Sequence, residues 1–144
     1  MEQRQTNEKY TAYHEAGLVV AYIHYGHAFD SVNLYDDSEI SGGVKEKDKN
    51  LRNAFPKDFA TIFLAGGAAE SKLRSQGLYE TGMSSDLLNA IDLVGHDESH
   101  NCMANAEGIV NENWSIVRFI AQALLEKKTL TYNEVLTIVD VMES

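Results

Sequence analysis

A chain of 144 residues in which 44% are hydrophobic and 24% are charged has the composition of one ordinary globular domain, long enough to bury a core without disulfides. Its formal net charge of -10 means that nucleic-acid backbones and anionic lipid surfaces would repel it, so neither is an expected partner. Cys102 is the only cysteine, which excludes an internal disulfide and agrees with a reducing compartment, the cytoplasm.

The first predicted element is a helix from Glu8 to about Tyr25. Thr6 or Asn7 can cap its start, and Glu8 lies near the positive end of the helix dipole. Two neighbouring faces carry mostly small or apolar residues, which predicts a largely buried helix. The first face consists of Tyr13, Gly17, Val20 and His24, and the second of Ala12, Ala16, Val19 and Ile23.

The segment from residue 30 to residue 46 changes to the period of a strand. Ser31 to Tyr35 and Ile40 to Val44, separated by a turn through residues 36 to 38, predict a short β-hairpin. The charged run 45 to 49 that follows is expected to be a solvated connection.

Two further helices are predicted after this connection. Pro56 suits the first turn of one helix, which is expected to end near Gly77. Ser84 can cap the next, which runs through Val94. The inward positions of the first are Phe59, Ile62, Phe63, Gly66, Ala69 and Leu73, and those of the second are Leu87, Leu88, Ile91 and Val94.

The C-terminal third predicts a fourth and a fifth helix. One apolar face of the fourth consists of Val110, Trp114, Val117, Ala121 and Leu124. Thr131 and Glu134 form a capping-box pattern that starts the fifth. Its buried positions are Val135, Ile138, Val139 and Met142. The predicted fold class is therefore mainly α with a small β-hairpin or sheet, an α+β domain.

No feature divides the chain or directs it to a membrane. It has one proline, no low-complexity stretch and no repeat, so residues 1–144 are expected to form a single domain. The start has no apolar run behind a basic cluster, so no secretory signal is expected. No apolar stretch has the length of a transmembrane helix.

The pentapeptide His14-Glu15-Ala16-Gly17-Leu18 lies inside the first predicted helix. In the HExxH motif of zinc hydrolases, two histidines at i and i+4 share a zinc ion, and the glutamate takes a proton from the metal-bound water. The fifth position here is Leu18. The His-Glu pair alone is weak evidence, because a helical histidine is usually a packing residue.

Two later blocks strengthen this interpretation. Leu64-Ala-Gly-Gly-Ala-Ala-Glu70 is followed by Thr81-Gly82-Met83-Ser84-Ser85-Asp86-Leu87. The order of the three blocks resembles the peptidase domain of the FtsH family of ATP-dependent zinc metalloproteases. That family reads HEAGH, then a short strand pair, a GGRAAE-like helix and a TGAxxDL turn. The resemblance covers roughly residues 10 to 140, including the stretch from Ala121 to Glu134.

The resemblance implies an FtsH-peptidase-like zincin domain and a role for each matching residue. His14 would be the first zinc ligand, Glu15 the general base and Asp86 the third ligand, while Leu18 occupies the position of the second ligand. The hairpin would offer an edge strand to an extended peptide or a flexible protein segment. A homo-oligomer is compatible with the sequence. No GxxxxGK[ST] loop is present, so no ATPase module is expected.

Two functions stay open at this point. One is a zinc metallopeptidase that hydrolyses peptide bonds with a metal-activated water. The other is a pseudopeptidase that binds peptides or proteins without cutting, because loss of the ligand at Leu18 weakens zinc binding or abolishes it. An unrelated helical domain with a chance His-Glu pair is a third reading. Without a metal, His14 is expected to take up a proton and pair with Asp86, since Glu15 and Asp86 would otherwise bring two carboxylates together.

The other histidines are poor substitutes for the missing ligand. His24 and His27 are about 15 and 20 Å from His14 along a continuous helix. His96 and His100 reach the site only if the chain doubles back, and a polar tract at a helix end is more often solvated. Asp86 has an alternative role too, since an aspartate in a first helical turn is favoured by the dipole alone.

Overall fold

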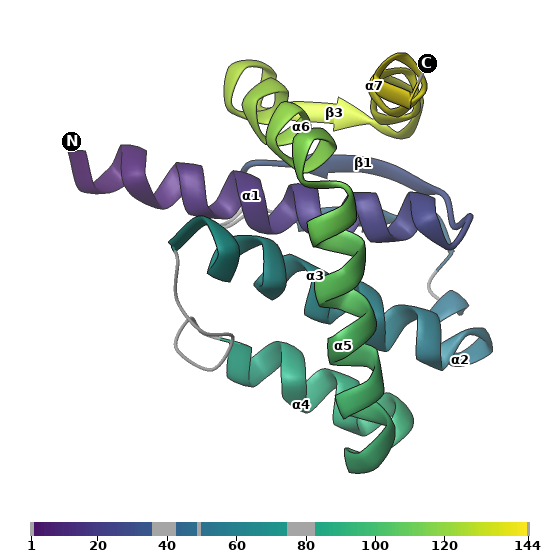
Figure 1. Ribbon diagram of the computed structural model, residues 1–144. Coiled ribbons are helices and arrows are strands. Elements are labelled where there is room, and N and C mark those ends of the chain that lie inside the picture. The colour runs from purple at the N-terminus through teal and green to yellow at the C-terminus, as the bar shows by residue number, and fades with distance from the viewer. Residues whose placement is uncertain (1, 36–42, 49, 75–82, 144) are drawn as a thin grey trace.

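The computed structural model describes residues 2–35, 43–48, 50–74 and 83–143, and these form seven helices and three short strands (Figure 1). The elements in chain order are α1 (Glu2–His24), β1 (Phe29–Asn33), β2 (Gly43–Glu46), α2 (Leu51–Ala54), α3 (Pro56–Arg74), α4 (Met83–Val94), α5 (His96–Glu112), α6 (Trp114–Lys127), β3 (Thr129–Thr131) and α7 (Tyr132–Glu143). The prediction of a mainly helical α+β chain is confirmed. None of the helices in these ranges has the length and the apolar run that a bilayer crossing requires.

The centre of the fold is the contact between α1 and α3, which lie side by side (Figure 1). A Cβ atom added to Gly17 would lie 2.5 Å from the carbonyl oxygen of Ala65 and 2.7 Å from the Cβ of Ala69. On the facing helix, a Cβ added to Gly66 would lie 2.8 Å from Nε2 of His14. The two glycines therefore allow the helices to approach more closely than any other residue would.

The remaining helices cover this pair. α5 and α6 cross it, with α5 against α3 and α6 against α1, and α4 packs on α3 away from α1 (Figure 1). Apolar side chains at helical spacing fill the space between them, as the periodicity predicts. The largest fully buried helical side chains are Phe59, Ile62, Leu64, Ile120, Leu124, Val19, Val110 and Val117.

The strands form one antiparallel sheet in the order β2-β1-β3. Val32 in the central strand is paired with Val44 of β2 and with Leu130 of β3. Val32 and Leu130 are fully buried, so this pair fixes the sheet to the core. The third strand, Thr129–Thr131, was not predicted, because a three-residue segment has no period of its own.

Several predicted boundaries are confirmed. α3 begins at Pro56 and α4 ends at Val94, as expected. The capping box at the start of α7 is formed in both directions: the backbone N–H of Thr131 donates to Glu134 Oε1 at 3.0 Å, and the backbone N–H of Glu134 donates to Thr131 Oγ1 at 3.1 Å. The expected helix end at Gly77 and the turn at Thr81 lie outside the described residues.

Other predictions were wrong in their limits. α1 begins at Glu2, earlier than the predicted Glu8. The predicted charged connection contains the end of β2 and leads directly into α2. The predicted strand of residues 40 to 44 is described only from Gly43, where β2 begins and continues to Glu46. Leu88 was expected to point inward, but 61% of it is exposed.

The predicted fourth helix is two helices separated at Asn113. The side-chain amide of Asn113 donates to the carbonyl of Ile109 at 2.8 Å, and its backbone N–H donates to the same carbonyl at 3.1 Å. A side chain that competes for the backbone carbonyls in this way ends a helix. Val110 therefore belongs to α5, while the rest of the predicted face belongs to α6.

The contact at Gly17 predicts an unusual response to alanine. We expect Gly17→Ala to lower the free energy of unfolding by about 1–3 kcal/mol, because its methyl group meets the backbone of α3. Gly108 in α5 is a matched control, since nothing lies within 4 Å of an added Cβ there. Gly108→Ala should stabilise the protein by about 0.5–1 kcal/mol. Urea denaturation measures both, and equal effects of the same sign would contradict the proposed close contact.

Candidate functional site

The structure brings His14 and Asp86 together from helices that are far apart in the sequence. His14 lies in the middle of α1, and Asp86 lies in the first turn of α4. Nε2 of His14 is 3.8 Å from Oδ2 of Asp86, and both side chains are largely buried. The dipole at the start of α4 accounts for an aspartate at this position, but not for its approach to an imidazole on another helix.

Glu70 is a second carboxylate partner of His14. Its Oε1 lies 3.3 Å from Nδ1 of the imidazole, while its Oε2 accepts a hydrogen bond of 3.0 Å from Nε of Arg74. Arg74 in turn stacks over the ring of Tyr10 at 3.5 Å. The two nitrogens of His14 therefore face one carboxylate each. The sequence contained a signal for Glu70, since this residue ends the Leu64–Glu70 block, but its role was missed.

Leu18 lies beside the imidazole, at the position of the missing ligand. Leu18 lies one turn after His14 on α1, and both side chains lie over Gly66 of α3. A Cβ added to Gly66 would lie 2.8 Å from Nε2 of His14 and 3.0 Å from Cγ of Leu18. An isobutyl group without a donor atom therefore lies next to the imidazole over the same glycine.

Glu15 is buried on the side of α1 that also carries Leu18. Only 5% of it is exposed, and its Oε1 has no hydrogen-bond partner among the described residues. It lines a cavity of about 170 Å³ bounded by α1, α2, α3 and β2. The other residues of this cavity are Leu18, Tyr22, Gly43, Val44, Glu46, Arg52, Ile62 and Phe63. A buried carboxyl oxygen without a hydrogen-bond partner costs free energy of folding.

The surroundings of His14 favour its charged form. Burial on its own opposes the charge, but the hydrogen bond to Glu70 and the negative charges of Glu15, Asp86 and Glu70 outweigh burial and raise the pKa of His14 to about 9. The imidazole therefore favours the doubly protonated form at neutral pH, in which it is hydrogen-bonded to Glu70 and attracted by the charge of Asp86 at 3.8 Å.

The pKa values of the three carboxyl groups do not all shift in the same direction: those of Glu15 and Asp86 are raised, and that of Glu70 is lowered. Burial raises the pKa of Glu15 to about 7, with His14 opposing and Asp86 adding to this shift. Burial also raises the pKa of Asp86, against the charge of His14. For Glu70, burial is outweighed by the hydrogen bond from His14 and by the charges of His14 and Arg74, so its pKa is lowered. Glu70 is therefore the permanent counter-ion of His14.

The other histidines lie elsewhere. Nε2 of His27 is 2.8 Å from Oδ2 of Asp58. His24 is the last residue of α1. His96 and His100 face each other with ring centroids 4.9 Å apart, and His96 is 72% exposed. Both side chains are exposed in the first turns of α5, as expected of a polar tract at a helix end.

The residues present do not make a catalytic zinc site. Such sites hold the ion with three protein ligands and keep one position for water. Among the three positions of the motif, His14 and Asp86 approach each other, and Leu18 supplies no third donor. In the described ranges, no group of three or more His, Cys, Asp or Glu side chains is arranged to hold a metal.

Comparison with known proteins adds no family assignment to this geometry. No protein-family model matches the chain, and a search of curated proteins finds no match.

The charge on His14 predicts how stability depends on pH. The pKa values of Glu15 and His14, about 7 and about 9, lie above the ordinary values of 4.5 and 6.5, so the folded state binds both protons more tightly than the unfolded state. The stability that these two protons contribute is fully present at a pH below the ordinary pKa values. It is lost as the pH rises through the raised pKa values of the folded state. The free energy of unfolding should therefore fall between about pH 5 and about pH 9.

NMR titration of the imidazole signals provides the direct measurement. The signal that His14→Gln removes identifies His14, and it should be half-titrated near pH 9. A midpoint at or below 6.5, or a stability that rises with pH over this interval, would contradict the arrangement.

Proposed function

We propose that this chain is a relative of the FtsH-type peptidase domain that binds an extended peptide or a flexible protein segment without cleaving it. The observation that carries the proposal is the environment of Leu18. An apolar side chain lies next to the imidazole of His14 over Gly66, at the position from which a second histidine would reach a shared ion. A metal bound by two ligands beside a leucine would be held weakly and in a distorted geometry.

A proton takes over part of the role of the ion in this proposal. His14 lies between Glu70 and Asp86 at 3.3 Å and 3.8 Å, and its positive charge offsets the repulsion between carboxylates that a metal would otherwise remove. The helices α1, α3 and α4 are thereby held together by an ion pair instead of a coordination bond. Zinc is accordingly weakly bound or absent.

The peptide-binding part of the proposal is supported by β2 and the Glu15 cavity. In the described ranges β2 pairs on one side only, with β1, and an edge strand can accept another strand. Val44 of this strand also lines the cavity, together with Phe63 and Leu18. A volume of about 170 Å³ suits one side chain of a peptide that runs along β2. The single cysteine supports a cytoplasmic location.

A zinc metallopeptidase is the second candidate, and one distance favours it. Zinc binds histidine nitrogen at about 2.0–2.1 Å and carboxylate oxygen at about 2.0–2.2 Å, so two such ligands lie at most about 4.3 Å apart. The separation of 3.8 Å between His14 and Asp86 is within this limit. Glu15 is next to His14 in the sequence, as the general base of such an enzyme would be.

Restoring the second histidine separates the two candidates. Leu18→His should acquire one zinc per chain, because its imidazole completes the set with His14 and Asp86, whereas the parent protein should contain none. Elemental analysis of protein purified without chelator measures this. Leu18→Phe supplies a ring without nitrogen and should resemble the parent. One zinc per chain in the parent, or cleavage of an unfolded substrate by it, would favour the enzyme and refute the binding proposal.

Binding is tested by substitutions on opposite faces of β2. Neighbouring side chains of a strand point to opposite faces, and Val44 lines the cavity while Lys45 is exposed. Val44→Glu should lower the affinity for a reduced, carboxymethylated unfolded protein at least tenfold, since it places a charge at the cavity wall. Lys45→Glu alters charge on the same strand and should have less than a twofold effect. Fluorescence anisotropy measures both, and equal losses would argue against this groove.

A further inference from the structure

His96 and His100 form an exposed pair of imidazoles on α5, outside the candidate site. Neither residue lines the Glu15 cavity, so inferences about the pair do not depend on the proposed peptide-binding function. The spacing of four residues on one continuous helix places both side chains on the same face. Their ring centroids lie 4.9 Å apart, with an angle of 74° between the ring planes.

The helical turn that joins the two histidines is fixed by Ser99. Its side chain is fully buried, and its hydroxyl donates a hydrogen bond of 2.6 Å to the carbonyl of His96. Its backbone N–H donates to the carbonyl of Gly95 at 3.0 Å. Because the backbone between the two imidazoles is already ordered, binding one ligand with both rings costs only side-chain freedom.

The separation of the rings suits two ligands of one metal ion. Imidazole nitrogen binds zinc at about 2.0–2.1 Å, so two rings that meet at one ion at roughly 90–110° have centroids roughly 4.5–5 Å apart. The observed 4.9 Å lies within this range. On His96, Nδ1 lies 3.9 Å from Oδ1 of Asp97. Histidines that bind metals commonly direct one ring nitrogen to a carboxylate and bind the ion with the other.

The charges around the pair allow a cation to bind. The positive end of the α5 dipole would disfavour a cation on its own. Asp97 and Glu98 in the first turn of α5 offset this effect with two negative charges. Lys57 approaches Glu98 at 3.7 Å, while Asp97 is fully exposed. The bonds from the two imidazoles would supply most of the affinity, because nitrogen ligands bind transition metals directly.

We propose that His96 and His100 chelate one divalent transition-metal ion, with water in its other coordination positions. Imidazole suits Cu²⁺, Ni²⁺ and Zn²⁺, whereas Ca²⁺ and Mg²⁺ prefer oxygen ligands. No third His, Cys, Asp or Glu side chain in the described ranges completes the set. Two protein ligands are fewer than the three or four of enzymatic and structural zinc sites, so the ion exchanges with solution and is lost during purification without added metal.

Titration of the full chain at neutral pH tests the class of metal. In calorimetry, copper(II) chloride should bind at one ion per chain and more tightly than nickel or zinc chloride, and magnesium chloride should not bind. In NMR spectra, paramagnetic Cu²⁺ should broaden the imidazole signals of His96 and His100 before that of His14. Equal affinity for Cu²⁺ and Mg²⁺, or first broadening at His14, would overturn the proposal. So would one ion for two chains, since the site would then lie between copies.

Exchanging two neighbouring residues tests the spacing without changing the composition. The double variant His100→Asn, Asn101→His moves the second imidazole by one position, about 100° around the helix. It should weaken copper binding at least tenfold, since even the loss of a partner outside the ligand set typically costs about 10–100-fold in affinity. Both positions are exposed, so folding is not expected to change, and circular dichroism checks this.

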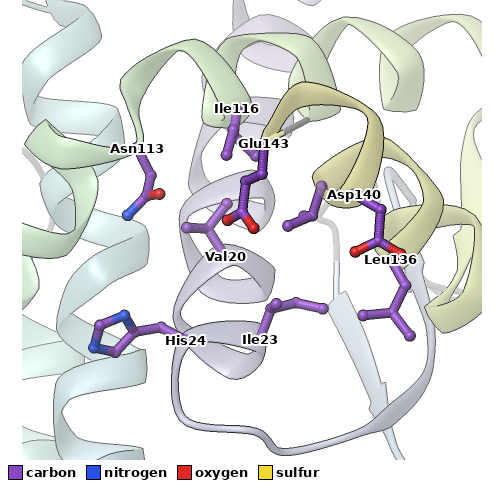
Figure 2. A pocket seen from close by; sticks show the side chains of 9 residues that line it. Val20, Ile23, His24, Asn113, Ile116, Leu136, Asp140 and Glu143 are labelled. Atoms are coloured by element: carbon purple, nitrogen blue, oxygen red, sulfur yellow. The ribbon is translucent and has the colours of Figure 1, made fainter.

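His24→Asn is the matched control. His24 is an exposed histidine at the end of α1, and no other histidine lines the cavity that contains it (Figure 2). Its substitution should alter the affinity for copper less than twofold. Equal weakening by the control and the exchange, or no weakening by the exchange, would mean that copper binds adventitiously to single exposed histidines, and the site would be refuted.

Discussion

The close contact between α1 and α3 is the constraint on which the rest of the structure depends. Gly17 and Gly66 allow the two backbones to meet without intervening side chains, and His14 and Leu18 then lie directly against α3. At this separation the imidazole reaches Glu70 on α3 and Asp86 on α4. Larger residues at either glycine would push the helices apart and separate the imidazole from its carboxylates. The charged cluster is therefore a consequence of backbone packing.

The cluster contains more acid than base, and its surroundings adjust to this. Three carboxyl groups, Glu15, Glu70 and Asp86, surround one imidazole, and Arg74 pairs with Glu70 from outside. When His14 is charged and Glu15 is protonated, His14, Glu15, Glu70 and Asp86 together carry a net charge of about -1. The positive charge of Arg74 compensates this net charge. A zinc ion would supply more positive charge, but here a leucine stands where its second ligand would be. The charges of the cluster therefore balance when His14 carries the extra proton in place of a metal ion.

Much of the helical fold could be predicted from the sequence, because apolar residues at helical spacing become buried wherever helices pack. Pro56 and the capping box of Thr131 and Glu134 marked helix starts through local chemistry that needs no tertiary contact. The third strand depends on pairing with β1, a partner about a hundred residues away, so no local pattern shows it. The break at Asn113 was missed for a related reason, since the apolar face continues through it.

The sequence predicted which residues form the candidate site better than it predicted the contacts between their side chains. His14, Glu15 and Asp86 were predicted from the order of three sequence blocks, and the structure brings His14 and Asp86 together. The role of Glu70 depends on which way the imidazole turns, and the isolation of Glu15 Oε1 depends on packing around it. Neither can be derived from spacing along the chain, because both are set by the distance between two helices. The cavity between α1, α6 and α7 likewise combines residues that are distant in sequence (Figure 2).

Helix α1 lines two cavities, the Glu15 cavity and one of about 350 Å³ between α1, α6 and α7. Glu15, Leu18 and Tyr22 of α1 line one, while Val20, Ile23 and His24 line the other. Because each residue turns the helix by about 100°, inserting or deleting a single position between Leu18 and Val20 would rotate Tyr22 and the residues of the other cavity relative to Glu15 and Leu18. Length changes in this stretch would therefore be far more damaging than substitutions. Homologous chains that preserve both cavities should vary in residue type along α1 but keep its length between these points constant.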